Sequence, residues 1–257
     1  MECCYSYPLL HHSFTPILRL ARVRGTLPMK SIQAIVPALN EEGSIGRVVR
    51  GLLDRGVSRV VVIDNGSTDD TAKEAARAGA SVVFEGVRGY GRACQAGIAV
   101  LQDADIVLFA DGDGCDDLDD LPALLEPLIT GGADLCIGSR TAGVTNRAAL
   151  PIHSQFGNRL CALLMRVSYG QKVTDMGPFR AIRADALDRL HLTDPNFGWN
   201  VEMQAKAALH RMKVVEVPVK YHPRTSGKSK ITGSLSKSLQ AGAVIIGTLL
   251  RIRLIGR

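Results

Sequence analysis

Residues 104–117 read ADIVLFADGDGCDD, and this stretch decides the fold. Residues 106–110 form an uninterrupted apolar run, which is typical of a strand buried on both faces in a parallel sheet. The run leads directly into Asp111-Gly112-Asp113. Open α/β sheets bind ligands at the C-terminal ends of their strands, and extended side chains two residues apart point the same way. We therefore expect both carboxylates to face one ligand.

Two carboxylates on a glycine-flanked loop suit a hard divalent cation. Mg²⁺ and Mn²⁺ prefer oxygen ligands and are often held by one or two carboxylates together with substrate phosphates. Taken alone, an Asp-Gly-Asp-Gly run is more typical of a plain turn. A calcium loop of the EF-hand type is excluded, because Pro122 stands where its glutamate would be. The rest of the chain favours the metal site.

Composition and charge narrow the class of protein. The chain has 257 residues, 46% of them hydrophobic, enough for one domain with a full core. Its six cysteines form no Cys-x-x-Cys pair, which suits buried thiols in a reducing compartment. Residues 201–257 carry 11 Lys/Arg against 2 acidic residues, whereas residues 1–200 carry 20 against 23. This basic quarter indicates an anionic partner (phosphate, acidic lipid or nucleic acid) or else a solvated basic face.

Strands alternate with helices along most of the chain, which predicts βαβ units and a mostly parallel sheet. Strands are expected over residues 32–36, 60–63, 81–84, 106–110, 134–137 and 214–219, with one more after the loop at 175–180. Helices are expected over 45–53, from Ser67 or Thr68 to 78, after Gly89, near Pro122, over 156–167, after Gly198 and over 235–250.

The two ends of the chain differ from the middle. Residues 1–30 lack apolar periodicity, and their basic residues follow the apolar stretch, which is the wrong order for a secretory signal. We expect them to be a poorly ordered extension. Residues 234–257 predict an apolar helix with basic residues at its end; its longest charge-free run is shorter than the ~20 residues that crossing a membrane requires. Such a helix lies on a membrane, packs on the domain, or does both.

Four blocks resemble glycosyltransferase family 2 of the GT-A fold, and within it the dolichol-phosphate mannose synthases and bacterial polyprenyl-phosphate sugar transferases. They are residues 35–42 (IVPALNEE), 62–69 (VIDNGSTD), 111–113 (DGD) and 177–180 (GPFR). The resemblance spans residue 32 to about residue 250. It implies a GT-A domain over 31–233, with a nucleotide-sugar half (31–140) and an acceptor half (141–233). It also implies inverting transfer of a sugar from a nucleotide-diphosphate sugar to an acceptor such as a polyprenyl phosphate.

The resemblance also implies roles for individual residues. Asp111 and Asp113 would be catalytic residues at the metal site. Asp113 would ligate the Mg²⁺ or Mn²⁺ that bridges the diphosphate of a UDP- or GDP-linked sugar, and Asp111 would lie by the ribose or in the outer metal shell. The nucleotide-sugar wall would comprise Pro37, Asn40, Glu41, Asp64, Gly66, Ser67, Asp111 and Gly112. Lipid-phosphate members often place Gln or another oxygen ligand where this chain has Cys115. A thiol is a poor Mg²⁺ ligand, so Asp116, Asp117 or water would complete the coordination.

On the acceptor side, basic residues resemble those with which lipid-phosphate members hold the acceptor phosphate. They are Arg140, Arg147, Arg224, Lys228 and Lys230, and we expect them to converge on a phosphate across the site from Asp113. Arg180, at the end of the 177–180 block, is also expected to bind the acceptor. Several Arg–phosphate contacts together are strong because they are charge-assisted. A phosphate acceptor is already ionised, whereas a hydroxyl acceptor would require a general base, for which Glu202 or Asp175 is the candidate.

Other functions remain open on the sequence. The main rival is a soluble family-2 transferase acting on a hydroxyl of a glycan precursor, and a non-enzymatic nucleotide-binding module is a second. Nucleic acid is not an expected partner, because an aromatic content of 5% offers no stacking platform. We expect a cytoplasmic protein, with peripheral association with the cytosolic membrane face as a further alternative.

Overall fold

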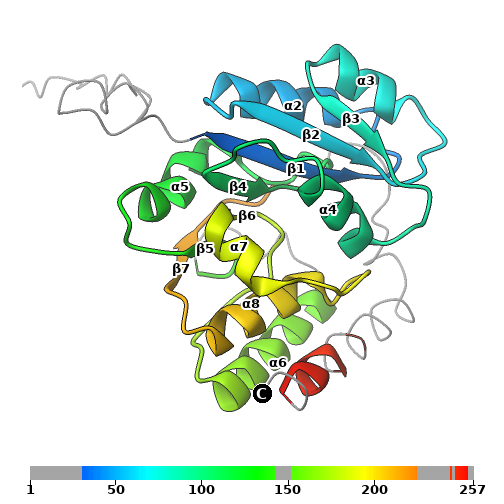
Figure 1. Cartoon of the computed structure of the whole chain (residues 1–257). Helices are drawn as coiled ribbons and strands as arrows, with labels where there is room; N and C mark the ends of the chain where they lie inside the picture. The colour runs from blue at the N-terminus through cyan, green and yellow to red at the C-terminus, as the bar shows by residue number, and fades with distance from the viewer. Residues whose placement is uncertain (1–30, 143–151, 225–243, 245–246, 254–257) are drawn as a thin grey trace, which may run out of the picture.

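The computed structural model describes residues 31–142, 152–224, 244 and 247–253, and side chains from residue 157 onward in the second of these ranges. A sheet of seven strands forms its centre (Figure 1). In spatial order the strands are β3 (Ser81–Phe84), β2 (Arg59–Asp64), β1 (Ile32–Ala38), β4 (Ile106–Phe109), β6 (Arg180–Arg183), β5 (Leu135–Ser139) and β7 (Val214–Pro218). Only β6 runs antiparallel to its neighbours. The predicted mostly parallel α/β sheet is confirmed.

The strand register brings the candidate residues to one edge of the sheet. Ala38 of β1 pairs with Asp64 of β2, and Ile35 of β1 pairs with Phe109 of β4. The loops that follow these strands therefore leave the sheet side by side. Because β6 is antiparallel, the loop that precedes it emerges at the same edge as the loops that follow β5 and β7. Loops from both predicted halves of the chain therefore leave the sheet at this edge.

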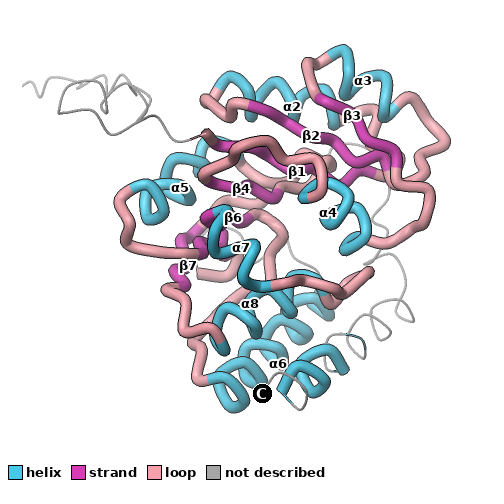
Figure 2. Tube along the Cα trace, viewed as in Figure 1, coloured by secondary structure: helices cyan, strands magenta, loops and turns pink. Residues whose placement is uncertain are grey.

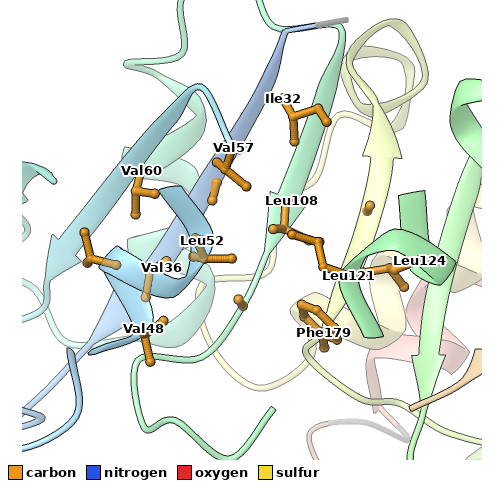
Figure 3. Packing of buried hydrophobic residues seen from close by; sticks show 14 of the residues in the cluster. Ile32, Val36, Val48, Leu52, Val57, Val60, Leu108, Leu121, Leu124 and Phe179 are labelled. Carbon is orange, nitrogen blue, oxygen red and sulfur yellow. The ribbon is translucent and has the colours of Figure 1, made fainter. Parts of the chain in front are cut away.

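Helices cover both faces of the sheet (Figure 2). On one face, helices α2 (Ile45–Asp54), α3 (Thr71–Arg77) and α5 (Leu121–Ile129) bury apolar side chains against the strands. Figure 3 shows this core, in which Val48 and Leu52 lie near Val36, and Leu121 lies near Leu108. On the other face lie α4 (Tyr90–Ile98), α7 (Ala184–Leu190) and α8 (Trp199–Leu209), where the Trp199 and Phe109 ring centroids are 6.4 Å apart.

A third apolar cluster joins α6 (Ile152–Tyr169) and α8 to the helical residues 247–253. Leu249 and Ile252 are buried in it, and the Tyr169 hydroxyl donates a hydrogen bond of 2.6 Å to the Leu249 carbonyl. Of the placements expected for the C-terminal helix, packing on the domain is therefore observed for these residues. No helix in the described part of the chain has both the length and the apolar character required to cross a bilayer.

Two details differ from the sequence-based expectations. Helix α3 begins at Thr71 rather than at Ser67 or Thr68, because those two residues hydrogen-bond Asn40 instead: the Asn40 N–H donates to Ser67 Oγ and the Thr68 N–H donates to Asn40 Oδ1. Helix α7 was not anticipated, since its seven residues are too few to show a helical period. The predicted extension 1–30 and most of 234–257 lie outside the described residues.

Close packing at the start of α4 gives a stability prediction. A Cβ at Gly91 would lie 1.9 Å from the Asp194 carbonyl oxygen, whereas a Cβ at Gly157 in α6 would meet nothing within 4 Å. Gly91→Ala should lower the free energy of unfolding by about 1–3 kcal/mol or more, because backbone must move to admit the methyl group. Gly157→Ala should raise it by about 0.5–1 kcal/mol. Urea unfolding of both variants tests the contrast, and equal effects would contradict it.

Candidate active site

The loops after β1 and β2 interlock to form one wall of the site. Asp64 is buried, and its Oδ1 accepts a hydrogen bond of 2.9 Å from the Ser67 N–H. Asn40 adopts a left-handed backbone conformation (φ 53°) and is bonded to the loop of residues 67–68. Gly66 has φ 83° and open space where a Cβ would stand. The structure therefore brings together Asn40, Asp64, Gly66 and Ser67, four of the residues assigned to the nucleotide.

Glu41 and Gly112 are placed differently from these four. The Glu41 N–H donates to Thr71 Oγ1 at 2.7 Å, and its buried carboxylate accepts two hydrogen bonds from Arg224 Nη1, at 2.8 and 3.0 Å. Gly112 packs beneath the end of β1, where a Cβ would lie 3.1 Å from Ile45 and 3.4 Å from Ala38. We conclude that Gly112 is required for packing of the loop and that the Glu41 side chain is engaged by an arginine.

The carboxylates of Asp111, Asp113 and Asp116, which follow β4, lie close together. Burial and the proximity of Asp113 and Asp116 raise the pKa of Asp111 well above its usual range. Burial and Asp113 also raise the pKa of Asp116, to about 7. Both Asp116 carboxylate oxygens are buried with no hydrogen-bond partner among the described residues. Like charges this close are unfavourable unless a cation joins them, so the cluster has the electrostatics of a cation site.

The donor set fits a cation that is shared with a phosphorylated ligand. Among the described residues no ready-made group of three or more His, Cys, Asp or Glu side chains could hold a metal ion alone. Asp111 and Asp113 would supply oxygen ligands, and diphosphate oxygens would complete the coordination of Mg²⁺ or Mn²⁺. The buried Cys115 is poorly suited to such a cation, because a thiol is a poor Mg²⁺ ligand and because burial and Asp113 raise its pKa to about 12.

Arg140, which follows β5, and Asp175, in the loop before β6, form a buried ion pair. Arg140 Nε and Nη2 lie 2.7 and 2.8 Å from the two Asp175 oxygens, and the Arg140 N–H also donates to Asp175. Burial alone would raise the pKa of Asp175, but Arg140 holds it below its usual range. The Arg140 guanidinium also lies 5.2 Å from the Tyr221 ring centroid. Asp175 therefore positions Arg140, and its carboxylate is poorly suited to take a proton.

Glu202 is engaged in the same way. Its carboxylate accepts hydrogen bonds from Thr193 Oγ1 and from the N–H groups of Thr193 and Asp194, and Lys206 Nζ lies 2.8 Å away. Burial opposes ionisation, but Lys206 and these donors hold the pKa of Glu202 below its usual range. The expectation that Glu202 or Asp175 acts as general base is not supported, because both carboxylates bind structural partners and are weak bases.

Two predicted acceptor arginines lie elsewhere than expected. Arg180 is fully buried; it donates to the Gly177 carbonyl and, at 3.0 Å, to the Asn200 carbonyl. Burial lowers its pKa to about 10, and it holds the loop before β6 in place. Arg224 does not lie across the site from Asp113, because its Nη2 donates to Asp113 Oδ2 at 2.7 Å. Arg147, Lys228 and Lys230 lie outside the described residues.

Two residues that shape the candidate site, Tyr221 and Asn65, were not identified from the sequence. Tyr221 follows β7 and contacts Arg140. Its position just after a parallel strand could have marked it as a candidate site residue. Asn65 follows β2; its side chain donates to the carbonyls of Glu85 and Val87 and accepts from the Gly89 N–H at 2.8 Å. It fixes the loop that leads into α4. Sequence gives no signal for these partners, which lie 20 or more residues away along the chain.

Comparison with known proteins adds a family context. The profile of glycosyl transferase family 2 matches residues 33–190. An uncharacterized glycosyltransferase of Mycobacterium tuberculosis is 39% identical over 213 residues, covering 82% of this chain and 94% of the relative. A dolichyl-phosphate hexose transferase of Haloferax volcanii is 30% identical over 207 residues, covering 78% and 86%. Glucosyl-3-phosphoglycerate synthase from M. tuberculosis, solved with Mn²⁺, uridine diphosphate and glucosyl-3-phosphoglycerate, has a TM-score of 0.72 at 25% identity, covering 96% of this chain and 86% of that chain.

Proposed function

Because the chain belongs to glycosyl transferase family 2, we propose that it transfers a hexose from a UDP- or GDP-linked sugar to a polyprenyl phosphate, with Mg²⁺ or Mn²⁺ bound at Asp111 and Asp113. One observation carries the choice of acceptor. Both carboxylates that could have served a hydroxyl acceptor as general base are bound to structural partners, whereas Arg140 and Arg224 lie at the site edge. A phosphate acceptor requires no base, and it requires cations.

The nucleotide-sugar part of the proposal rests on the loops after β1 and β2 and on the carboxylates after β4. Asn40, Asp64 and Ser67 are held rigidly at the sheet edge and would contact base and ribose. Glucosyl-3-phosphoglycerate synthase, which shares the fold, binds Mn²⁺ and uridine diphosphate. Asp113 would hold the cation, which stabilises the charge that develops on the departing diphosphate.

The acceptor half rests on the arginines and on one relative. The Haloferax dolichyl-phosphate hexose transferase is named for a lipid phosphate. In the proposed reaction a phosphate oxygen attacks the anomeric carbon from the face opposite the diphosphate, the bond from that carbon to the diphosphate breaks, and the configuration inverts. Arg140 is already oriented by Asp175 and would hold the phosphate with its planar guanidinium.

A transfer assay over a matrix of substrates tests the proposal. Radiolabelled UDP- and GDP-sugars are each incubated with Mn²⁺ and one of three acceptors: a polyprenyl phosphate, 3-phosphoglycerate or a simple glycoside. We expect label in the lipid phase with polyprenyl phosphate and none after EDTA is added. Transfer to phosphoglycerate or to the glycoside, with none to lipid, would instead support the soluble family-2 transferase.

A lipid acceptor also implies contact with a membrane, and one surface suits it. Helix α6 exposes Leu163 and Val167, and the adjoining residues 247–253 expose Leu250. Exposed arginines accompany them, at positions 159, 166, 251 and 253, and α6 contains no acidic residue. Apolar side chains beside cations are the pattern of a surface that rests on anionic lipid, where each cation contributes about 1 kcal/mol.

The double variant Leu163→Asp/Val167→Asp tests this surface. It should reduce binding to phosphatidylglycerol vesicles by about tenfold or more, because two apolar contacts are lost and two negative charges are added. Both side chains are exposed, so the fold should be retained. Phe84→Asp is the matched control, since Phe84 is equally exposed but lies on the far edge strand β3. Vesicle co-sedimentation gives the result, and equal losses in both variants would contradict the proposal.

A further inference from the structure

Arg224 connects two acidic residues that belong to different parts of the proposed site. Its Nη1 contacts both oxygens of Glu41, and its Nη2 donates to Asp113 Oδ2 at 2.7 Å. Glu41 follows β1, Asp113 follows β4 and Arg224 follows β7, so the contact joins three strand ends. The carboxylates of Glu41 and Asp113 are almost fully buried and the Arg224 side chain is 21% exposed. The guanidinium therefore compensates two buried negative charges.

A divalent cation at Asp113 would compete with this arrangement. The Oδ1 atom of Asp113 already accepts the Cys115 N–H at 3.0 Å, and Oδ2 is taken by Arg224. A cation bound to Oδ2 would stand beside the guanidinium with like charge and compete for the same lone pairs. Repulsion between the two positive charges therefore favours displacement of Arg224 from Asp113 when the cation binds.

Glu41 determines where Arg224 goes when it leaves. The Glu41 backbone is fixed by Thr71 Oγ1, and its carboxylate binds Nη1 through both oxygens, independently of Asp113. We propose that Arg224 is an internal counter-ion that occupies the cation's ligand Asp113 before the donor binds, and that Glu41 then retains Arg224 beside the diphosphate. This inference rests on the proposed function, and it makes Glu41 a positioning residue for Arg224 rather than a ligand of the nucleotide.

After displacement, Nη2 would be the free arm of a tethered guanidinium. Released from Asp113, it lies next to the cation and the phosphate oxygens and can donate to the diphosphate or to the acceptor phosphate. Binding of the metal–nucleotide complex would thereby free the positively charged group of Arg224 that then binds the acceptor phosphate. Donor binding should precede acceptor binding for this reason.

Binding of Mn²⁺ in the absence of nucleotide tests the competition without turnover. Without the diphosphate the ion would be held weakly, by the two carboxylates and water, so the titration compares the variants with the wild type at high Mn²⁺ concentration. Free Mn²⁺ is measured by electron paramagnetic resonance over a titration of the protein. Arg224→Ala should bind Mn²⁺ about tenfold more tightly than the wild type, because the competing charge is gone. Arg224→Lys, which keeps the charge, should stay within about twofold of the wild type, and so should Arg183→Ala, whose exposed arginine pairs with Asp185. Asp113→Asn should abolish binding.

Two outcomes overturn the inference in distinguishable ways. Unchanged Mn²⁺ affinity in Arg224→Ala, together with loss in Asp113→Asn, would show that Arg224 does not compete and would leave the metal assignment intact. Unchanged affinity in Asp113→Asn would remove the metal assignment itself and the inference with it. Neither result depends on the acceptor, because the Mn²⁺ titration contains none. The lipid-phosphate proposal is tested separately, by the transfer assay.

The positioning role of Glu41 has a test of its own. Glu41→Gln keeps the shape and removes the charge that holds Arg224. We expect the KM for the acceptor to rise about fivefold or more, with UDP affinity in the presence of Mn²⁺ within about twofold of the wild type. A nucleotide-binding role would instead lower the affinity for UDP and leave the KM for the acceptor unchanged, and that result would overturn the assignment.

Discussion

Asp113→Asn is expected to lower kcat by about a thousandfold or more, because the cation it would hold supplies several kcal/mol to the departure of the diphosphate. The variant removes one negative charge from the cluster with Asp111 and Asp116, which relieves like-charge repulsion, and Arg224 keeps its pair with Glu41, so the fold should be retained. Steady-state kinetics with saturating Mn²⁺ and a thermal melt of each protein provide the two readings.

The matched control for this variant is Asp119→Asn. Asp119 comes from the same acidic loop, but its side chain is 71% exposed and pairs with Arg55 away from the site. It should retain kcat within about twofold, as expected for a weak surface ion pair. Equal activity of the two variants would show that Asp113 does not hold the catalytic cation.

Asp175→Asn is expected to lower the free energy of unfolding by about 3–5 kcal/mol at pH 7, because it leaves the buried Arg140 charge without its anion. Asp175 also accepts hydrogen bonds from the Arg140 N–H and from the Asn158 amide, which a neutral amide replaces poorly. Asp185→Asn is the control, since Asp185 is exposed and its pair with Arg183 should contribute less than about 1 kcal/mol. Urea unfolding measures both.

The pH dependence of this loss has a definite sign. The pKa of Asp175 is lowered in the folded protein, so its carboxylate stabilises the fold fully above the unfolded pKa of about 3.9. That stabilisation decreases as the pH falls through the unfolded pKa towards the lower folded one. The difference between wild type and Asp175→Asn should therefore be constant from pH 8 to about pH 5 and shrink below about pH 4. A difference that grows on acidification would contradict the assignment.

Sequence alone predicted the sheet and the edge at which the site forms. Apolar runs such as residues 106–110 are buried on both faces and therefore carry a clear pattern. Since parallel strands share one C-terminal edge, the sequence places Asp64 and Asp113 at the same edge of the sheet. Short elements are missed by this kind of prediction: the seven residues of α7 are too few to show a helical period.

The partners of the charged side chains could not be predicted in the same way. From the sequence, a basic residue near an acidic site is predicted to bind phosphate. In the structure, Arg180 instead binds backbone carbonyls, and Arg224 binds Glu41 and Asp113. Glu202 reads as a base, yet its carboxylate holds a neighbouring loop. Charge and position in the chain place such residues near the site, whereas their partners depend on packing between segments up to 183 residues apart.

Transfer to a phosphate oxygen is tested most directly by a matched pair of acceptors. One polyprenol is supplied either as its monophosphate or as the free alcohol, in the same detergent, with Mn²⁺ and the radiolabelled nucleotide sugar that the protein accepts. We expect label in the lipid phase with the phosphate only, released again as free sugar by mild acid, and we expect Asp113→Asn to abolish it. Equal labelling of the alcohol, or labelling of neither lipid while a soluble hydroxyl acceptor is glycosylated, would contradict the assignment.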